Sequence, residues 1–496
     1  MLGTTAVVVA NMGDRPLRVR VVSEPAPPPT PGVVPGAVAA PPPDHTFDRV
    51  IKGGRVIDPD SGYDAVADVG IDGSTITSIS EVALRGTTEI DATGLVVSPG
   101  FIDVLSYEPR DYGIWYKVAD GVTTNLGMHG MNMVADDYFA YFDAPENRPP
   151  VHHGGAFDNP YMREVNGMGS AAATTSQVET LRRQLEEGFG VGWLGLDVEP
   201  EYTPWVTTEE IVALAQVAAA NDLPVFFHAR YSSPDDPGKD NAAAIAEILQ
   251  VARETGAGVH VDHITSTGGT FTMDETIGTL DAARSEGLDV TACMYPYDFW
   301  ATYAASPRFG PGWEERYRIS YADLEVPGTD EEVSAETWPR LQAENRLVAA
   351  HAIPEEDVRA ALRTPWIMIG SDSILEEGDN NHPRATGTYA RTLGHYVRDE
   401  QVLALPDALA RMTILPARRL ERRCPALRRK GRLQIGADAD ITVFDPATVG
   451  DRSTIDDPAQ ESVGIEWVLV MGTAVRTPDG NDREQRGGTA ITPELA

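Results

Sequence analysis

The chain is poor in cysteine and in long apolar stretches, and each shortage excludes a class of protein. Its two cysteines, Cys293 and Cys424, are too few for a disulfide scaffold or for a zinc module held by four cysteines. The sequence has no run of about 18 apolar residues, so no helix of membrane-spanning length is expected. An apolar fraction of 42% is instead typical of a soluble globular protein.

Basic residues are also scarce. The 75 acidic residues outnumber the 40 basic ones and give a formal charge of −35. This charge argues against nucleic acid or an anionic membrane as partner, because both would repel an acidic surface. We expect a small-molecule partner, and the sequence indicates no oligomeric state.

The N-terminal residues carry little that could form a core. Residues 1–10 lack the basic start of an export signal, which favours a cytoplasmic location. Two β-prone runs around Gly13 predict a short hairpin at 6–22. Residues 25–43 contain nine prolines and few bulky side chains, and they therefore predict an extended linker.

Beyond the linker, two β-rich stretches flank a long middle stretch in which apolar β runs alternate with amphipathic helical patterns. Eight strand–helix units of about 40 residues suit the middle, so we expect an α/β protein: a (β/α)₈ barrel with one small β domain formed from both flanks. The expected segments are a tail and linker at 1–45, the first part of the β domain at 46–98, the barrel at 99–427 with a candidate lid at 299–342, the second part of the β domain at 428–480 and a tail at 481–496.

Chemistry-bearing residues follow the predicted barrel strands. The sequence has no nucleophile elbow, Walker loop or dinucleotide fingerprint, so esterase, phosphoryl-transfer and hydride-transfer chemistry lack support. His228, His263 and Asp372 instead each end an apolar strand. Because active sites of such barrels lie at the carboxyl ends of the strands, these three residues indicate a metal with an adjacent general base.

The same pattern leaves two choices open. His260 lies on the opposite face of its strand from His263, so only one of them can point into the barrel, and His263 is the better candidate because it ends the strand. For a third ligand, His129 lies in a glycine-flanked turn after an early strand, and the adjacent pair His152 and His153 competes with it.

The chain resembles the amidohydrolase superfamily, and within it the N-acyl-D-amino-acid deacylases, including the N-acyl-D-glutamate branch. The resemblance extends from 48 to 476. The motifs that carry it are Asp48-Arg-Val-Ile-Lys-Gly-Gly-Arg-Val-Ile-Asp58, Val97-Ser-Pro-Gly-Phe-Ile-Asp103, Gly121-Val-Thr-Thr124, His382-Pro-Arg-Ala-Thr-Gly-Thr388, Met412-Thr-Ile-Leu-Pro-Ala-Arg418 and Gly436-Ala-Asp-Ala-Asp440.

The resemblance implies a (β/α)₈ barrel whose small flanking domain is a β-sandwich, and a zinc-dependent hydrolase of linear amides. His228 and His263 match the two strand-end metal histidines of the family, and Asp372 matches its catalytic aspartate. His129 stands where these deacylases carry a cysteine ligand. Arg384 and Tyr295 match the residues that bind the substrate's α-carboxylate, together with His382 from the same motif as Arg384.

The sequence departs from the family pattern at two places. The superfamily's His-x-His metal pair is replaced by Leu105 and Tyr107, so we expect one zinc per chain rather than two. Thr265 replaces a substrate-binding lysine, and Arg230 could supply the missing charge or form a structural ion pair. The rival interpretations are a cyclic-amide or other carbonyl hydrolase on the same barrel, and a degenerate barrel without catalysis.

Overall fold

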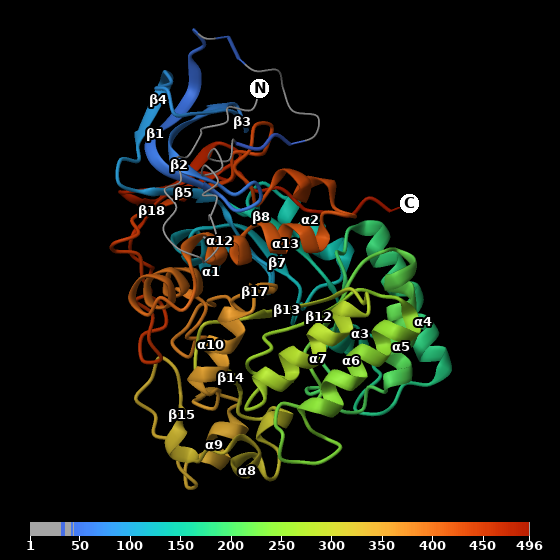
Figure 1. The fold of residues 1–496 in the computed structure, drawn as a ribbon. Helices are drawn as coiled ribbons and strands as arrows, with labels where there is room; N and C mark the ends of the chain where they lie inside the picture. The colour runs from blue at the N-terminus through green and yellow to red at the C-terminus, as the bar shows by residue number, and fades with distance from the viewer. Residues whose placement is uncertain (1–30, 35–40, 43, 496) are drawn as a thin grey trace, which may run out of the picture.

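The computed structural model describes residues 31–34, 41–42 and 44–495, and in it a barrel of parallel strands stands beside a sheet built from both ends of the chain (Figure 1). The predicted hairpin at 6–22 and most of the proline-rich linker lie outside these residues. No helix in the described part of the chain is long and apolar enough to cross a membrane.

Eight strand positions make up the barrel within the described residues. They are β6 (Phe101–Asp103), β7 (Val122–Gly127), the consecutive β8 (His152–Gly155) and β9 (Phe157–Asp158), β10 (Leu196–Val198), β11 (Val225–Phe227), β12 (Val259–Val261), β13 (Val290–Met294) and β17 (Ile367–Ile369). Neighbours pair in parallel from β6 to β8 and from β9 through β13 to β17. The N–H of Asp372, after β17, donates to the carbonyl of Leu105, after β6, at 2.8 Å and joins the two ends of the strand series.

Helices between the strands cover the outside of the barrel (Figure 1). They are α1 (Asp111–Ala119), α2 (Ala135–Asp143), α3 (Asn159–Val165), α4 (Thr175–Val191), α5 (Thr208–Ala220), α6 (Asn241–Thr255), α7 (Met273–Ser285), α10 (Glu355–Arg363), α11 (Thr388–Arg391), α12 (Leu405–Met412) and α13 (Ile414–Leu420). Polar side chains cap the N-terminal ends of two of these helices. The Thr207 side chain accepts a hydrogen bond from the backbone N–H of the third residue of α5, and the Asp240 side chain does the same for α6. Strands and helices bury a large apolar core, and further buried residues of the barrel strands form a second, smaller cluster.

The second part of the fold is a nine-stranded sheet around its own apolar core. Its strands are β1 (Phe47–Asp58), β2 (Tyr63–Asp72), β3 (Thr75–Ser80), β4 (Gly86–Asp91), β5 (Val96–Pro99), β18 (Ile441–Phe444), β19 (Ile465–Val470), β20 (Thr473–Thr477) and β21 (Gly480–Asn481). The two flanks meet where β5 pairs antiparallel with β18. The α/β class, with a parallel barrel and a β domain drawn from both flanks, is therefore confirmed.

A small antiparallel sheet interrupts the barrel between β13 and β17, at the foot of Figure 1. It contains β14 (Trp300–Tyr303), β15 (Leu324–Glu325) and β16 (Leu347–Ala350), with the short helices α8 (Trp313–Tyr317) and α9 (Trp338–Ala343) beside them. Aromatic side chains in this stretch pack together, with the ring centroids of Phe309 and Trp338 4.9 Å apart.

Candidate active site

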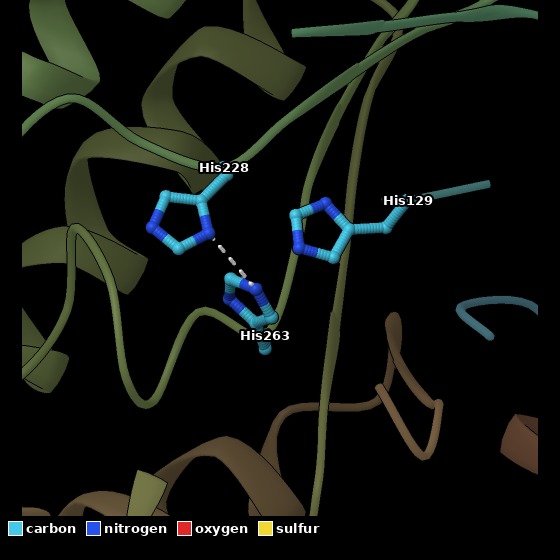
Figure 2. A group of neighbouring side chains, drawn as sticks. All are labelled: His129, His228 and His263. Atoms are coloured by element: carbon cyan, nitrogen blue, oxygen red, sulfur yellow. Dashed lines mark hydrogen bonds between the residues drawn. The ribbon is translucent and has the colours of Figure 1, made fainter. Parts of the chain in front are cut away.

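Three histidine side chains from three barrel strands converge on one point (Figure 2). His228 Nδ1 lies 3.2 Å from His263 Nε2. The ring centroid of His129 lies 5.5 Å from that of His228 and 5.3 Å from that of His263. Each ring offers one nitrogen to the group, and these nitrogens all lie within 4.8 Å of one another. This spacing suits three ligands of one metal ion.

His228 and His263 are held by the strand ends that carry them. His228 follows β11, and its outward Nε2 lies 2.8 Å from Glu201 Oε2, which fixes the ring with Nδ1 facing the group. His263 follows β12 with a positive φ of 27°, a conformation that non-glycine residues rarely adopt and that occurs at functional sites. Burial lowers the pKa of both imidazoles well below the usual value, so both are neutral, as metal ligands must be.

His129 lies in the turn after β7, facing two carboxylates from the end of β10. The N–H of Gly130 donates to Asp197 Oδ2 at 3.1 Å and to Glu199 Oε1 at 3.2 Å. The same oxygens lie 3.6 and 3.4 Å from His129 Nδ1. Burial opposes a charge on His129, but Glu199 and Asp197 outweigh it and raise its pKa well above the usual value. The carboxylates around His129 therefore stabilise a positive charge at this position.

Asp372 stands beside the three histidines. It follows β17 with a φ of 53°, and its Oδ1 and Oδ2 lie 3.8 Å from His129 Nε2 and His263 Nε2 respectively. Oδ1 is buried without a hydrogen-bond partner among the described residues. Burial raises the pKa of this carboxyl, but His263 and Arg384 more than offset it and hold the pKa well below the usual value. Asp372 is therefore an ionised, available base.

Arg384, Tyr295 and His382 surround the far side of Asp372. Arg384 is fully buried and donates from Nη2 to Asp372 Oδ2 at 2.7 Å. Its Nε and Nη1 have no hydrogen-bond partner in the described part of the chain, and its Cζ lies 3.7 Å from the centroid of the Tyr295 ring. His382 lines a cavity of about 360 Å³ with Asp372 and His129. Arg384 therefore has N–H groups to spare behind Asp372, which itself lines a cavity large enough for a small organic molecule.

Leu105 and Tyr107, which stand in place of the His-x-His pair, offer no imidazole ligand to the site. Leu105 is buried in an apolar cluster. Tyr107 lines the cavity, with its ring centroid 6.0 Å from that of His129. Burial, with the charge of Asp372, raises the pKa of the Tyr107 hydroxyl well above the usual value, so it stays neutral and a poor metal ligand.

Arg230, a substrate-binding candidate from the sequence, already has a carboxylate partner. Its guanidinium forms a two-pronged ion pair with Glu247 on α6, through Nε at 2.7 Å and Nη2 at 2.8 Å. Of its two proposed roles, the structural ion pair is the one that the geometry supports, because the fork is already occupied by a carboxylate.

The competing pair His152 and His153 lies elsewhere, on β8. His152 Nε2 lies 3.0 Å from Lys430 Nζ, and His153 Nδ1 lies 3.2 Å from the hydroxyl of Tyr138. Neither belongs to the group around His228 and His263. His129 therefore remains the third-ligand candidate that the geometry favours.

The sequence analysis missed three acidic residues of the site: Asp197, Glu199 and Glu201. They occupy alternate positions at and after the end of β10, in the same strand-end setting as the histidines. That setting was the signal that could have identified them. Two of them flank His129, and the third holds His228.

Comparison with known proteins places this arrangement among amidohydrolases. The profile described as "Amidohydrolase family" matches residues 318–476. The N-acyl-D-glutamate deacylase of Alcaligenes xylosoxydans xylosoxydans is 33% identical over 469 residues, covering 86% of this chain and 93% of that protein. The D-aminoacylase of the same organism is 29% identical over 473 residues, covering 86% and 94%.

A solved structure gives the same result for the fold. It is that of the N-acyl-D-glutamate deacylase from Bordetella bronchiseptica, complexed with zinc and a phosphonate inhibitor that mimics the reaction's tetrahedral intermediate. It aligns with a TM-score of 0.77 at 28% identity, covering 90% of this chain and all of that one.

Proposed function

The chain belongs to the amidohydrolase family and is a metal-dependent enzyme acting on carbon–nitrogen bonds, and from this premise we propose that it removes the acyl group from N-acyl-D-amino acids. N-acyl-D-glutamate is the leading substrate candidate. The observation that carries the proposal is that three ligand nitrogens meet beside Asp372, which lines the cavity with an unpaired oxygen and is held by Arg384, an arginine with two unpaired N–H groups.

One zinc per chain fits the donor set. His129, His228 and His263 would hold it, since three imidazole nitrogens are a common set for a catalytic zinc with an open position. Zinc held this way polarises a carbonyl group and lowers the pKa of water toward neutrality. Leu105 and Tyr107 offer no second set of histidine ligands, which supports a mononuclear centre.

The chain's own residues supply the proton transfers and the orientation. Asp372 accepts the proton of the attacking water at Oδ1 and returns it to the leaving amine. Arg384 orients Asp372 through Oδ2, and its free N–H groups bind the α-carboxylate of the substrate. The Tyr295 ring packs against this guanidinium, and residues of β14 line the cavity.

The proposal is tested with purified protein and matched substrates. We expect amine release from N-acetyl-D-glutamate, little from the L isomer, and none from the cyclic amides dihydroorotate and hydantoin. Elemental analysis should find about one zinc per chain. Activity confined to the cyclic amides would favour the rival hydrolase, and a metal-free, inactive protein would favour a degenerate barrel.

The third ligand can be tested by replacing His129. His129→Ala should lose most of the zinc, because only two protein ligands remain, whereas His129→Cys should keep zinc and part of the activity, because a thiolate can take the same position. Zinc content and amine release are the measurements. His153→Ala serves as the control and should keep its zinc. Normal zinc in His129→Ala would remove this residue from the ligand set.

Arg384→Ala should affect binding and turnover differently. KM should rise about tenfold or more for N-acetyl-D-glutamate and much less for its α-amide, because only the former presents the α-carboxylate to the arginine. kcat should fall for both substrates, because Asp372 loses the donor that orients it. An equal rise in KM for acid and amide would remove Arg384 from the carboxylate site.

A further inference from the structure

A second cavity, of about 320 Å³, lies at the other end of the barrel. Its walls are residues that precede strands: Pro224 before β11, Gly258 before β12, Asp289 before β13 and Trp366 before β17. Helix α13 and the turn after it complete the lining. It shares no lining residue with the cavity over Asp372, so the two are separate sites.

The charge of this cavity is opposite to that of the chain. Five arginines and two aspartates line it, which gives a formal charge of +3 in a chain whose total is −35. The arginines are Arg284, Arg418, Arg419, Arg422 and Arg423. Arg418 also contacts Asp60, outside the lining, which leaves an excess of about two positive charges. A local excess of positive charge in an acidic chain favours the binding of an anion at this cavity.

Arg419 is the buried member of the cluster. Its side chain is 3% exposed, and Nη1 donates to Asp289 Oδ1 at 2.6 Å. Its Nε and Nη2 are buried without a hydrogen-bond partner among the described residues. Burial, together with the repulsion of Arg422 and Arg284, lowers its pKa in spite of Asp289. Buried guanidinium N–H groups normally have partners, so these two donors are available to a ligand.

The neighbouring residues keep space open around Arg419. Gly258 has no side chain, and a Cβ placed there would lie 2.9 Å from Arg419 Nη2 and 2.4 Å from Asp289 Oδ2. The Arg284 guanidinium stacks on the Trp366 ring at 4.6 Å, which fixes both at the cavity wall. Arg423 Nε lies 3.3 Å from Asp222 Oδ2 and completes the charged lining.

We propose that this cavity binds a small phosphate-bearing molecule, with Arg419 as the main ligand-binding residue and Arg423 in support. A guanidinium holds a phosphate through two parallel N–H donors. A phosphate ester carries close to two negative charges at neutral pH, which matches the excess charge of the lining. The volume lies in the range that admits a small organic ligand as well as free phosphate.

Calorimetric titration of the full-length, zinc-loaded protein with inorganic phosphate and with AMP tests the proposal. We expect saturable binding with one site per chain. Arg419→Gln should weaken it at least tenfold, and Arg423→Gln should weaken it less. The control is Arg183→Gln, an exposed arginine on α4 paired with Glu187, which should bind as the wild type does. Arg384→Ala should also bind normally, which separates this site from the metal centre.

Tighter binding of AMP than of phosphate would assign the site to an organic phosphate, and equal binding would assign it to free phosphate. Should Arg419→Gln fail to fold, Arg419→Lys keeps the charge beside Asp289 but loses the fork, and it should still bind at least tenfold more weakly. Absence of saturable binding, binding unchanged in the Arg419 variants, or equal binding of the polycarboxylate citrate would overturn the phosphate assignment.

Discussion

Replacing His263 with alanine is expected to abolish amide hydrolysis and to leave the purified protein without stoichiometric zinc. His263 Nε2 lies 3.2 Å from His228 Nδ1, and the proposed site has three protein ligands and none in reserve. Removing a ligand therefore removes the metal and the chemistry that depends on it. Elemental analysis and amine release measure the two effects, and His228→Ala should give the same result.

A matched control distinguishes loss of a ligand from loss of stability. His260 is also buried, on the same strand, and its Nδ1 lies 2.7 Å from Thr291 Oγ1 rather than in the histidine group. His260→Ala should lower the melting temperature yet keep zinc and activity. A folded His263→Ala protein that still holds one zinc per chain would mean that the ligand set is wrong.

Replacing Asp372 with asparagine should lower kcat about a hundredfold or more while zinc content stays at one per chain. Asparagine is nearly the same size and can still accept from Arg384 through Oδ1, but it cannot take up a proton from water. General-base catalysis is typically worth about 10²–10⁴-fold, which sets the expected loss. Steady-state kinetics and elemental analysis on one preparation give both quantities.

KM should change much less than kcat in this variant, because the free N–H groups of Arg384 do not involve the carboxylate that is lost. Near-normal kcat with zinc intact would leave the proposed mechanism without its base. Loss of zinc together with activity would instead make Asp372 a residue that supports metal binding.

Much of the fold and of the histidine group could be predicted because the strands of such barrels follow a regular sequence pattern. Strands buried on both faces read as short apolar runs, and a polar residue directly after such a run must lie at the rim that carries the site. His228, His263 and Asp372 all follow strands in this way, and the structure brings them together with His129. The order of motifs along the chain then identified the superfamily.

The partners of these residues could not be predicted, since they depend on how distant segments meet in space. Arg384 donates to Asp372, and Glu201 holds His228, although nothing in the spacing of these residues indicates either contact. Arg230 had two plausible roles in the sequence, and its ion pair with Glu247 on α6 favours the structural one. The positive φ angles at Asp372 and His263 likewise could not be predicted, because non-glycine residues rarely adopt them.

The adjacent histidines of β8 illustrate the same limit. Sequence alone could only say that the two point to opposite faces of an extended segment. In the structure, His152 lies beside Lys430 and Asp440, a buried charged pair from the C-terminal part of the chain. Burial lowers the pKa of His153 to about 3, which keeps it neutral beside Tyr138.

The pairing of β5 with β18 sets an order of events during synthesis. The Ser98 hydroxyl bonds to the carbonyl of Thr442, 344 residues later, so β5 leaves the ribosome long before its partner exists. At ordinary translation rates the wait is on the order of tens of seconds. During this time the apolar edge of β5 is unpaired and can pair with a strand of another chain. A ribosome-associated chaperone that shields this edge should therefore raise the yield of soluble enzyme, and truncation before β18 should produce aggregates.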